Sequence, residues 1–304
     1  MLKAMSAALL AGYERPALYR RVADFAALTK LRVVVMVLIT TSVGFYLGSW
    51  GWMDWVRLLH TLIGVAAAAA GTLALNQYIE RDIDARMART RSRPLPDGRL
   101  EATEALAFGV AITASGLIYL TWLVNPLSGF ITAISVGSYL FLYTPLKRIT
   151  SQCIIVGAIP GALPPVAGWA AARGELGLEA CVLFSILFFW QIPHSLAIAV
   201  LYRDDYARAA IHFPPVVEPD GTSTGRQVVS YCLALLAVGL LPTAIRLAGT
   251  VYFVAAFMLG AAFLACGIML AMSHSSGAAR RLLWASLLYL PALLGLMALD
   301  KVHL

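Results

Sequence analysis

The sequence predicts an all-α fold, a polytopic membrane bundle of nine transmembrane helices, from its composition and its hydropathy pattern. Hydrophobic residues make up 60% of the 304 residues and charged residues only 13%. Soluble domains carry about 45–50% apolar and about 25% charged residues. A soluble globule of this length buries only about three quarters of its potential surface, so it could not hide this much apolar surface. The composition therefore predicts a protein that is folded in lipid.

Nine stretches of the chain are apolar enough to become membrane spans, which need roughly 20 residues each. The third and fourth are joined only by a tight turn at Asn125 and Pro126. Several contain proline, which membrane helices tolerate when neighbouring helices satisfy the freed backbone groups. The predicted spans are residues 31–49, 56–79, 103–124, 126–143, 151–172, 178–200, 227–248, 250–272 and 280–299.

The distribution of Lys and Arg predicts the orientation of these spans. With a cytoplasmic N-terminus, all but four of the 23 basic residues fall on the cytoplasmic side. We therefore expect residues 1–29 to form a cytoplasmic N-terminal segment and residues 30–304 to form the nine-helix membrane domain, which ends outside. The expected location is a bacterial inner membrane. The excess of Lys and Arg on the cytoplasmic side also explains the net charge of +7, so no nucleic-acid partner is expected.

The second span runs into polar residues that can share one helical face. Asn76, Glu80 and Asp84 are spaced i, i+4 and i+8, a drift of only about 80° if the helix continues. Asp82 then points to roughly the opposite side. An amide and two carboxylates along one stripe form an oxygen-rich surface of the kind that Mg²⁺ prefers, particularly when the ion also bridges substrate phosphates.

Arginines follow this acidic stripe directly, and guanidinium groups suit phosphate oxygens. Carboxylates beside arginines are the arrangement expected around a Mg²⁺–diphosphate complex. The alternative is a juxtamembrane stretch of solvated ion pairs, and the spacing alone does not separate the two interpretations. The arginines are Arg86, Arg89, Arg91 and Arg93.

The sixth span and the loop after it hold a second polar group. His194 follows Trp190 by four residues within an apolar run. A lone histidine in a membrane helix is a functional candidate, although a neighbouring helix can also satisfy one. Asp204 and Asp205 follow Tyr202 and are either a second metal-binding edge or a solvated helix end.

A shorter basic segment closes the fourth span. Tyr143 and Lys147 are four residues apart there, followed by Arg148. The basic pair satisfies the positive-inside rule. Alternatively, Lys147 is a further phosphate contact and Tyr143 a hydrogen-bond donor.

Several of these segments resemble a known family. The acidic stripe with Arg89-Thr90-x-x-Arg93-Pro94-Leu95 resembles the first motif of the UbiA superfamily of intramembrane prenyltransferases, and Tyr143-x-x-x-Lys147 resembles a further element of that superfamily. Other blocks, in the expected order, are similar to the branch that transfers a farnesyl group to heme B. They are Leu28-Thr29-Lys30, Tyr143-Thr144-Pro145-Leu146-Lys147-Arg148, Gly161-Ala162-Leu163-Pro164-Pro165-x-x-Gly168, Trp190-Gln191-Ile192-Pro193-His194 and Asp205-Tyr206-x-x-Ala209.

This resemblance implies a Mg²⁺-dependent prenyltransferase domain over residues 30–304. Its substrates would be farnesyl diphosphate and heme B, met within membrane lipid, and its products heme O and diphosphate. A heme A synthase is the expected downstream partner.

The resemblance also implies roles for individual residues. The expected catalytic and metal-binding residues are Asn76, Glu80, Asp84 and Asp205. The expected diphosphate-binding residues are Arg89, Arg93, Tyr143, Lys147 and Arg203. The expected heme-binding residues are Trp190, His194 and Tyr202.

The chain departs from the family pattern in places. Leu31 stands where proline is usual, Glu80 where aspartate is more usual, and residues 210–214 read Ala-Ile-His-Phe-Pro instead of a Gly-Ile-Pro-Met-Leu-like segment. The shape of that loop and the role of His212 stay open.

Two other functions remain as alternatives. One is an aromatic prenyltransferase of quinone biosynthesis, which the segment from Trp190 to His194 disfavours. The other is a membrane transporter, whose ion-coupling acids usually lie near the midplane rather than at one face.

Overall fold

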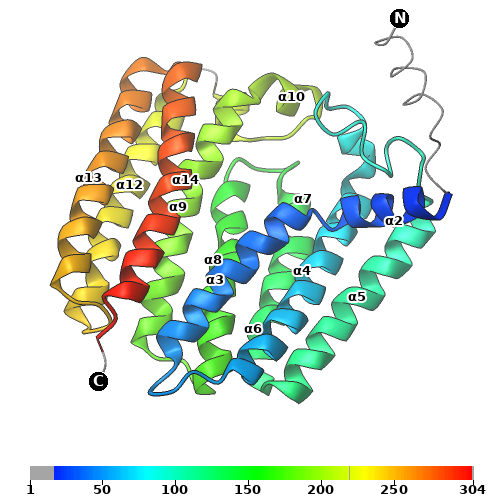
Figure 1. The fold of residues 1–304 in the computed structure, drawn as a ribbon. Helices are drawn as coiled ribbons and strands as arrows, with labels where there is room; N and C mark the ends of the chain where they lie inside the picture. Colours follow the sequence, from blue (N-terminus) through cyan, green and yellow to red (C-terminus); the bar gives the residue numbers. More distant parts are fainter. Residues whose placement is uncertain (1–16, 219, 303–304) are drawn as a thin grey trace, which may run out of the picture.

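The computed structural model describes residues 17–218 and 220–302. Apart from an isolated β-bridge between Ala248 and Lys301, these residues form helices and loops (Figure 1). Nine helical segments within them are long and apolar enough to cross a membrane. They are α3 (Leu31–Gly48), α4 (Trp55–Asp84), α5 (Ala102–Leu123), the continuous segment of α6 (Pro126–Gly137), η1 (Ser138–Tyr143) and α7 (Thr144–Leu146), α8 (Cys153–Arg173), α9 (Leu178–Leu201), α12 (Thr222–Ala244), α13 (Thr250–Ser273) and α14 (Ser276–Leu299).

The nine predicted spans are confirmed, and most of their ends differ from the predicted bounds by one to five residues. The seventh begins at Thr222 rather than at 227 and the ninth at Ser276 rather than at 280. The Ser275 hydroxyl accepts a hydrogen bond from the backbone N–H of Ala278. This cap starts α14 among polar residues, where a hydropathy window gives no signal. The predicted turn before α6 is confirmed, because the Asn125 side chain caps that helix.

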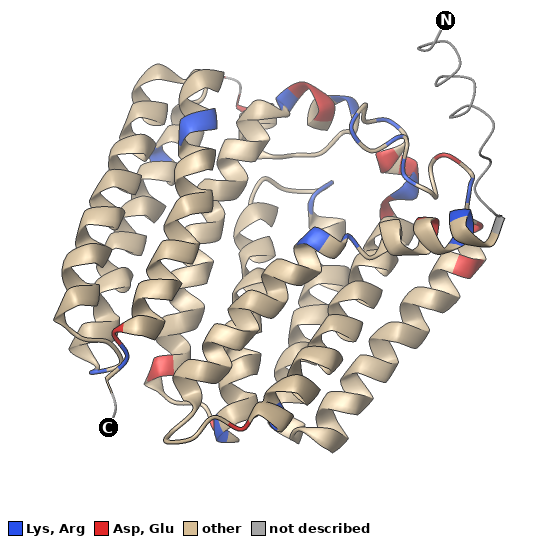
Figure 2. Ribbon diagram, viewed as in Figure 1, with Lys and Arg blue, Asp and Glu red and all other residues tan. Residues whose placement is uncertain are grey.

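Charged residues gather at the two ends of the bundle and leave the middle almost free of them (Figure 2). One end, which we call the polar end, carries the loop of residues 85–101 and three short helices. These are α2 (Ala17–Leu28), α10 (Arg203–Arg208) and α11 (Pro214–Val217). The arrangement is that of a multi-pass membrane protein. Of the predicted N-terminal segment, residues 1–16 lie outside the described residues.

Helices α3 and α8 are in close contact. A Cβ atom added at Gly44 would overlap the backbone carbonyl of Pro165, and one added at Gly168 would overlap that of Thr41. Small residues allow such backbone approach in membrane bundles. The contact fixes α8 beside α3, and these two helices form part of the wall of the cavity described below.

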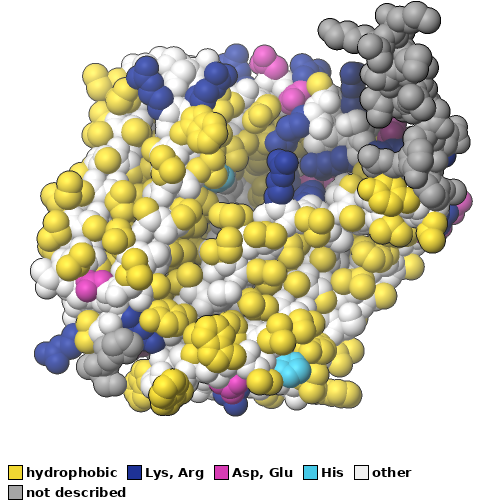
Figure 3. Space-filling model, in the orientation of Figure 1, with side chains coloured by type: hydrophobic (Ala, Val, Ile, Leu, Met, Phe, Trp, Pro, Cys, Tyr) yellow, Lys and Arg dark blue, Asp and Glu magenta, His cyan; other side chains and the backbone are white. Residues whose placement is uncertain are grey.

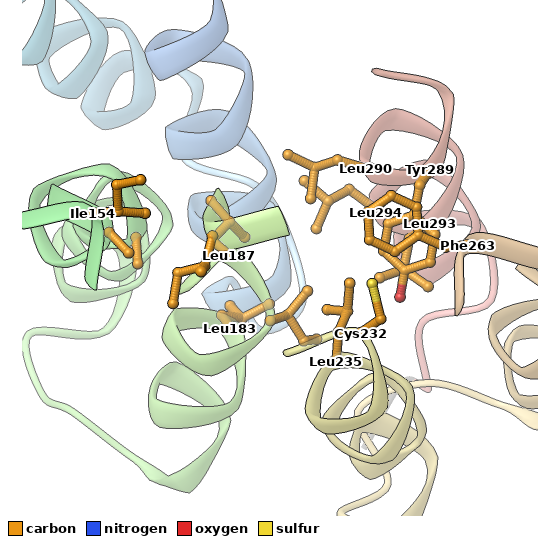
Figure 4. Close-up of a cluster of buried hydrophobic side chains, with 14 of the residues drawn as sticks. Ile154, Leu183, Leu187, Cys232, Leu235, Phe263, Tyr289, Leu290, Leu293 and Leu294 are labelled. Atoms are coloured by element: carbon orange, nitrogen blue, oxygen red, sulfur yellow. The ribbon is translucent and has the colours of Figure 1, made fainter. Parts of the chain in front are cut away.

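The helices of the second half of the chain share one apolar core with residues of the first half (Figure 4). Leu187 of α9 and Leu235 of α12 meet Leu293 of α14, and all three side chains are buried. The core holds α9 against α14, which determines where the polar residues of α9 can point.

Candidate functional site

The polar stripe of α4 is buried at the polar end of the bundle. The helix continues to Asp84, so the predicted shared face is confirmed. Asn76, Glu80 and Asp84 are 1%, 8% and 1% exposed. The side chain of Asp82 is 80% exposed and lies 4.0 Å from the Arg81 guanidinium. The structure therefore separates one acid from the group, as the helical spacing predicts.

Each buried oxygen group of the stripe meets a cation from a different part of the chain. Lys147 Nζ donates to Glu80 Oε1 at 2.7 Å, and Arg93 Nη1 donates to Asp84 Oδ2 at 2.6 Å. Lys30 Nζ, which lies just before α3, donates to Asn76 Oδ1 at 3.1 Å. A buried carboxylate without such a partner would destabilise the fold strongly.

Lys30 is a site residue that the sequence analysis did not assign. Its backbone has a φ of 48° at the N-cap of α3, an uncommon left-handed conformation for a lysine. The preceding helix is anchored nearby, because Gln77 Nε2 donates to the carbonyl of Leu28 at 2.7 Å. Only the resemblance of the Leu28-Thr29-Lys30 block pointed to this residue.

The loop of residues 85–101 folds back over the end of α4. The Thr90 hydroxyl donates to the carbonyl of Asp84 at 2.8 Å, which satisfies one of the free carbonyls at the helix end. Arg99 pairs with Asp24 of α2 and also donates to the carbonyl of Ser92. These bonds hold the loop in place and direct Arg93 toward Asp84.

Burial affects Lys147 and Lys30 differently. At Lys147, burial favours the neutral amine, but Tyr143 and the Glu80 carboxylate outweigh it and raise the pKa of the ammonium above its ordinary value. At Lys30, burial and then the nearby Arg93 guanidinium lower the pKa to about 7. Lys147 is therefore a permanent cation at neutral pH, whereas Lys30 titrates near neutrality.

Lys30 should make stability depend on pH. Its pKa is about 7 in the fold against an ordinary 10.5, so the unfolded chain binds more protons between these values and stability should rise with pH across that window. We expect Lys30→Met to remove this rise, measured as thermal midpoints in detergent from pH 7 to 10. Arg32→Met, which alters an exposed neighbour, should keep it. Parallel curves for wild type and Lys30→Met would contradict the assignment.

A π-helical turn, η1, orients the residues opposite Asn76. Asn76 Nδ2 donates to the Thr144 hydroxyl at 3.3 Å, and that hydroxyl donates to the carbonyl of Tyr139 at 2.8 Å. The rings of Tyr139 and Tyr143 are 5.5 Å apart, and Lys147 Nζ lies 4.3 Å from the centre of the Tyr143 ring. The structure thus brings the predicted Tyr143 and Lys147 to the acidic stripe and adds Tyr139 and Thr144.

An apolar cavity of about 310 Å³ lies directly below this polar cluster. Tyr139 and Tyr143 stand at its upper end, and along α8 it extends from Gly157 to Ala167, about 15 Å at the rise of a helix. An added Cβ at Gly161 would overlap the Gln191 side chain, so glycine lets Gln191 of α9 pack against this wall. Figure 3 shows the surface hollowed near the polar end, with Lys and Arg on one side and hydrophobic side chains around it.

A second cavity, of about 210 Å³, adjoins the first through shared residues and is lined by Arg89. The Arg89 guanidinium lies 4.8 Å from the ring centre of Tyr202 and 5.8 Å from that of Tyr206. Such cation–π contacts hold an arginine in place without neutralising it. Within the described residues Arg89 has no carboxylate partner, so its charge remains available to an anion.

Asp205 lies against the loop that follows α4. Its Oδ1 accepts a hydrogen bond from the backbone N–H of Ala88 at 3.4 Å and also pairs with Arg208. The structure therefore brings the predicted Asp205 to the loop beside the acidic stripe. In the described part of the chain Asp205 makes no hydrogen bond or ion pair with Glu80 or Asp84.

Arg203 faces elsewhere. It borders Asp204 at 3.7 Å, and both line a separate cavity of about 300 Å³ beside α12 and α13. The predicted role of Arg203 at the diphosphate stays a prediction, and the geometry favours Arg89 in that position. The backbone N–H of His212 donates to the carbonyl of Lys147 at 2.8 Å. This bond ties the unusual loop to the segment that holds Lys147.

Trp190 and His194 form a stacked pair turned toward α14. Their ring centres are 4.8 Å apart at 21° between planes. Trp190 Nε1 donates to the backbone carbonyl of Ser286 at 2.9 Å, and His194 Nδ1 is 2.7 Å from the Ser286 hydroxyl oxygen. Ser286 is a fourth residue that the sequence analysis missed, because a serine in an apolar run carries no local signal of a partner on another helix.

The donor set at the polar end fits a hard divalent cation. Lys147 and Arg93 each occupy one carboxylate oxygen, which leaves a second oxygen on Glu80 and on Asp84. Carboxylate and amide oxygens suit Mg²⁺, which binds through one or two carboxylates and completes its shell with water and substrate phosphate. No group of three or more His, Cys, Asp or Glu side chains in the described ranges is arranged to hold a metal by itself. The residues therefore suit an ion that arrives with a phosphate ligand.

Comparisons with known proteins agree on one family. The model of the UbiA prenyltransferase family matches residues 37–292. The chain is 49% identical to a protoheme IX farnesyltransferase of Solibacter usitatus (strain Ellin6076), covering 91% of this chain and 98% of that one. It is 42% identical to a protoheme IX farnesyltransferase of Koribacter versatilis (strain Ellin345), covering 94% and 96%.

Solved structures share the fold at low sequence identity. A structure of digeranylgeranylglyceryl phosphate synthase superposes with a TM-score of 0.80 at 15% identity, covering 94% of this chain and all of that one. A UbiA homologue from Archaeoglobus fulgidus bound to GPP and Mg²⁺ superposes with a TM-score of 0.64 at 16% identity, covering 90% and 99%. The chain belongs to the UbiA prenyltransferase family.

Proposed function

We propose that this protein transfers the farnesyl group of farnesyl diphosphate to a vinyl group of heme B, which gives heme O and diphosphate. The observation that carries the proposal is the position of a buried cluster of paired carboxylates and cations at the mouth of an elongated apolar cavity. Such a cavity suits a chain of a few isoprene units, and the charged cluster suits its diphosphate. The relatives named protoheme IX farnesyltransferase support heme B as the acceptor.

The diphosphate binds at the polar end. Arg89, Arg93 and Lys147 supply positive charge where negative charge develops as the carbon–oxygen bond breaks, which is where electrostatic stabilisation is most effective. Oxygens of Asn76, Glu80 and Asp84 would hold Mg²⁺, which would supply positive charge to neutralise the diphosphate. The Mg²⁺ bound with GPP in a solved UbiA homologue supports this assignment, and Asp205 is the proposed fourth ligand.

The farnesyl chain lies in the 310 Å³ cavity, and its reacting carbon lies near Tyr139 and Tyr143. Apolar walls exclude water from the allylic cation that forms. Electron-rich tyrosine faces favour a cation beside them. The vinyl group then forms the new carbon–carbon bond, and a water molecule supplies the hydroxyl of the product and releases a proton.

The acceptor approaches on the side of α9, where Trp190, His194 and Tyr202 are the proposed heme contacts. We propose that the polar end faces the cytoplasm of a bacterium and that the bundle spans its inner membrane. The bias of Lys and Arg toward this end supports that orientation. Heme O then serves terminal oxidases directly or as the substrate of a heme A synthase.

An aromatic acceptor, as in quinone biosynthesis, is the second candidate within the same chemistry. A small aromatic acid such as hydroxybenzoate or naphthoate would not need a second set of polar contacts on the side of α14. The polar pair of Trp190 and His194 on α9 therefore favours heme as the acceptor. Because the chain belongs to a prenyltransferase family, the alternative function of a membrane transporter is no longer supported.

An assay with purified protein tests the proposal. We expect farnesyl diphosphate, hemin and Mg²⁺ to give heme O, identified by mass, and we expect EDTA to abolish its formation. Hydroxybenzoate and naphthoate in place of hemin should give no prenylated product. Prenylation of either aromatic acid without any farnesylated heme would refute the assignment of the acceptor.

A further inference from the structure

The contacts of Ser286 define the protonation of His194. The Ser286 hydroxyl donates to the carbonyl of Leu283, one turn earlier on α14, at 2.6 Å. A serine hydroxyl has a single proton to donate. With that proton directed to Leu283, the hydroxyl oxygen can only accept from His194 Nδ1, which lies 2.7 Å away. Both contacts of the hydroxyl are hydrogen bonds only when Nδ1 carries the proton of the neutral imidazole.

The other ring nitrogen, Nε2, is consequently a free acceptor. No group in the described part of the chain hydrogen-bonds to it, and it is absent from the buried polar atoms that lack a partner there. Nε2 thus reaches the accessible surface of the bundle. Along α9, Gln191 lines both cavities of the site and Ser195 lines the smaller one, whereas neither lining includes His194. The free nitrogen is therefore accessible on the helix that carries these two site residues.

The surroundings favour the neutral ring. The only acidic residue of α9 and α14 is Glu179, which lies about 22 Å along the helix from His194. No carboxylate in the described ranges pairs with the ring, and an unpaired charge among apolar side chains is unfavourable. The stacked Trp190, itself bonded to the backbone of Ser286, fixes the plane of the ring.

We propose that Ser286 is a positioning residue that holds His194 in the Nδ1–H tautomer, so that Nε2 binds the iron of the heme substrate. The inference rests on heme being the acceptor. A hydrogen-bonded outer partner of this kind commonly orients a metal-binding histidine through its other nitrogen. A neutral Nε2 has a lone pair but no proton, so it can bind iron and cannot donate to a heme propionate. The tautomer thus decides between two roles that the residue type alone leaves open.

A comparison of two porphyrins tests this inference. Metal-free protoporphyrin IX carries the same propionates as hemin but offers no iron. We expect Ser286→Ala to weaken the binding of hemin by about 10-fold or more and to leave the binding of protoporphyrin IX nearly unchanged. His194→Ala should show the same selective loss. The Soret band and electron paramagnetic resonance signal of bound hemin should lose their histidine-ligated character in both variants.

Ser185→Ala is the matched control, because the Ser185 hydroxyl bonds only to the carbonyl of Cys181 on its own helix. It should bind both porphyrins as wild type does. Equal loss of the two porphyrins in a Ser286→Ala protein that keeps the thermal midpoint of the wild type, or no loss of either, would overturn the inference. The proposed function fails separately, if the wild type neither binds hemin nor forms farnesylated heme.

Discussion

Asp84→Asn is expected to lower the rate of farnesyl transfer by about 100-fold or more. The substitution keeps the shape of the side chain but removes the charge that pairs with Arg93 at 2.6 Å and that would help to hold Mg²⁺. Asp84 is 1% exposed, so no water can replace the missing carboxylate. Formation of heme O, measured by mass with purified protein, is the readout.

Asp82→Asn is the matched control for this prediction. It removes the same charge two residues away, on a side chain that is 80% exposed and lies outside the stripe, and it should retain wild-type activity. The two variants together separate a local role of Asp84 from a general effect of charge at the polar end. A folded Asp84→Asn protein within about 10-fold of wild-type activity would refute the assignment of the metal site.

Lys147→Met is expected to have the second largest effect, again a loss of about 100-fold or more in transfer. Lys147 is a permanent cation of the cluster, held by Glu80 at 2.7 Å and by the face of Tyr143. Its removal takes away one of the three positive charges, with those of Arg89 and Arg93, that are proposed to stabilise the leaving diphosphate. Single-turnover rates with saturating farnesyl diphosphate measure the chemical step directly.

The variant also leaves Glu80 buried without a partner, which typically costs about 3–5 kcal/mol in stability. The double variant Lys147→Met with Glu80→Gln removes that unpaired charge and should recover thermal stability, but not activity. Recovery of activity in the double variant would mean that Lys147 serves only to neutralise Glu80. Arg148→Met, which changes the exposed neighbouring cation, should leave the rate unchanged.

Local patterns in the sequence predict the fold and half of the site. Hydropathy is a property of each segment by itself, so the nine spans could be read without knowledge of their partners. Helical periodicity likewise placed Asn76, Glu80 and Asp84 on one face and excluded Asp82, because that geometry depends on a single helix.

The missing half of the site consists of contacts between segments far apart in the chain. Lys30 reaches Asn76 across 46 positions, and Ser286 meets His194 across 92. A serine or lysine at the margin of an apolar run has many ordinary explanations, so its sequence context does not identify its partner. The direction of Arg203 depends on the packing of α10, a six-residue helix that hydropathy does not reveal.

The π-helical turn η1 has a further consequence for how this sequence can vary. Its wider turn accommodates one more residue than an α-helix would. Tyr143 is the last residue of the turn, and Thr144 and Lys147 follow it. Deletion of one residue between Ser138 and Leu142 would restore regular helical bonding, and the residues after the turn would keep nearly their present orientation, because the wide turn absorbs the extra residue. Lys147 would therefore still reach Glu80, whereas Tyr139, which lies inside the turn, would change its direction. The wide turn thus determines how Tyr139 faces the site and has little influence on Lys147.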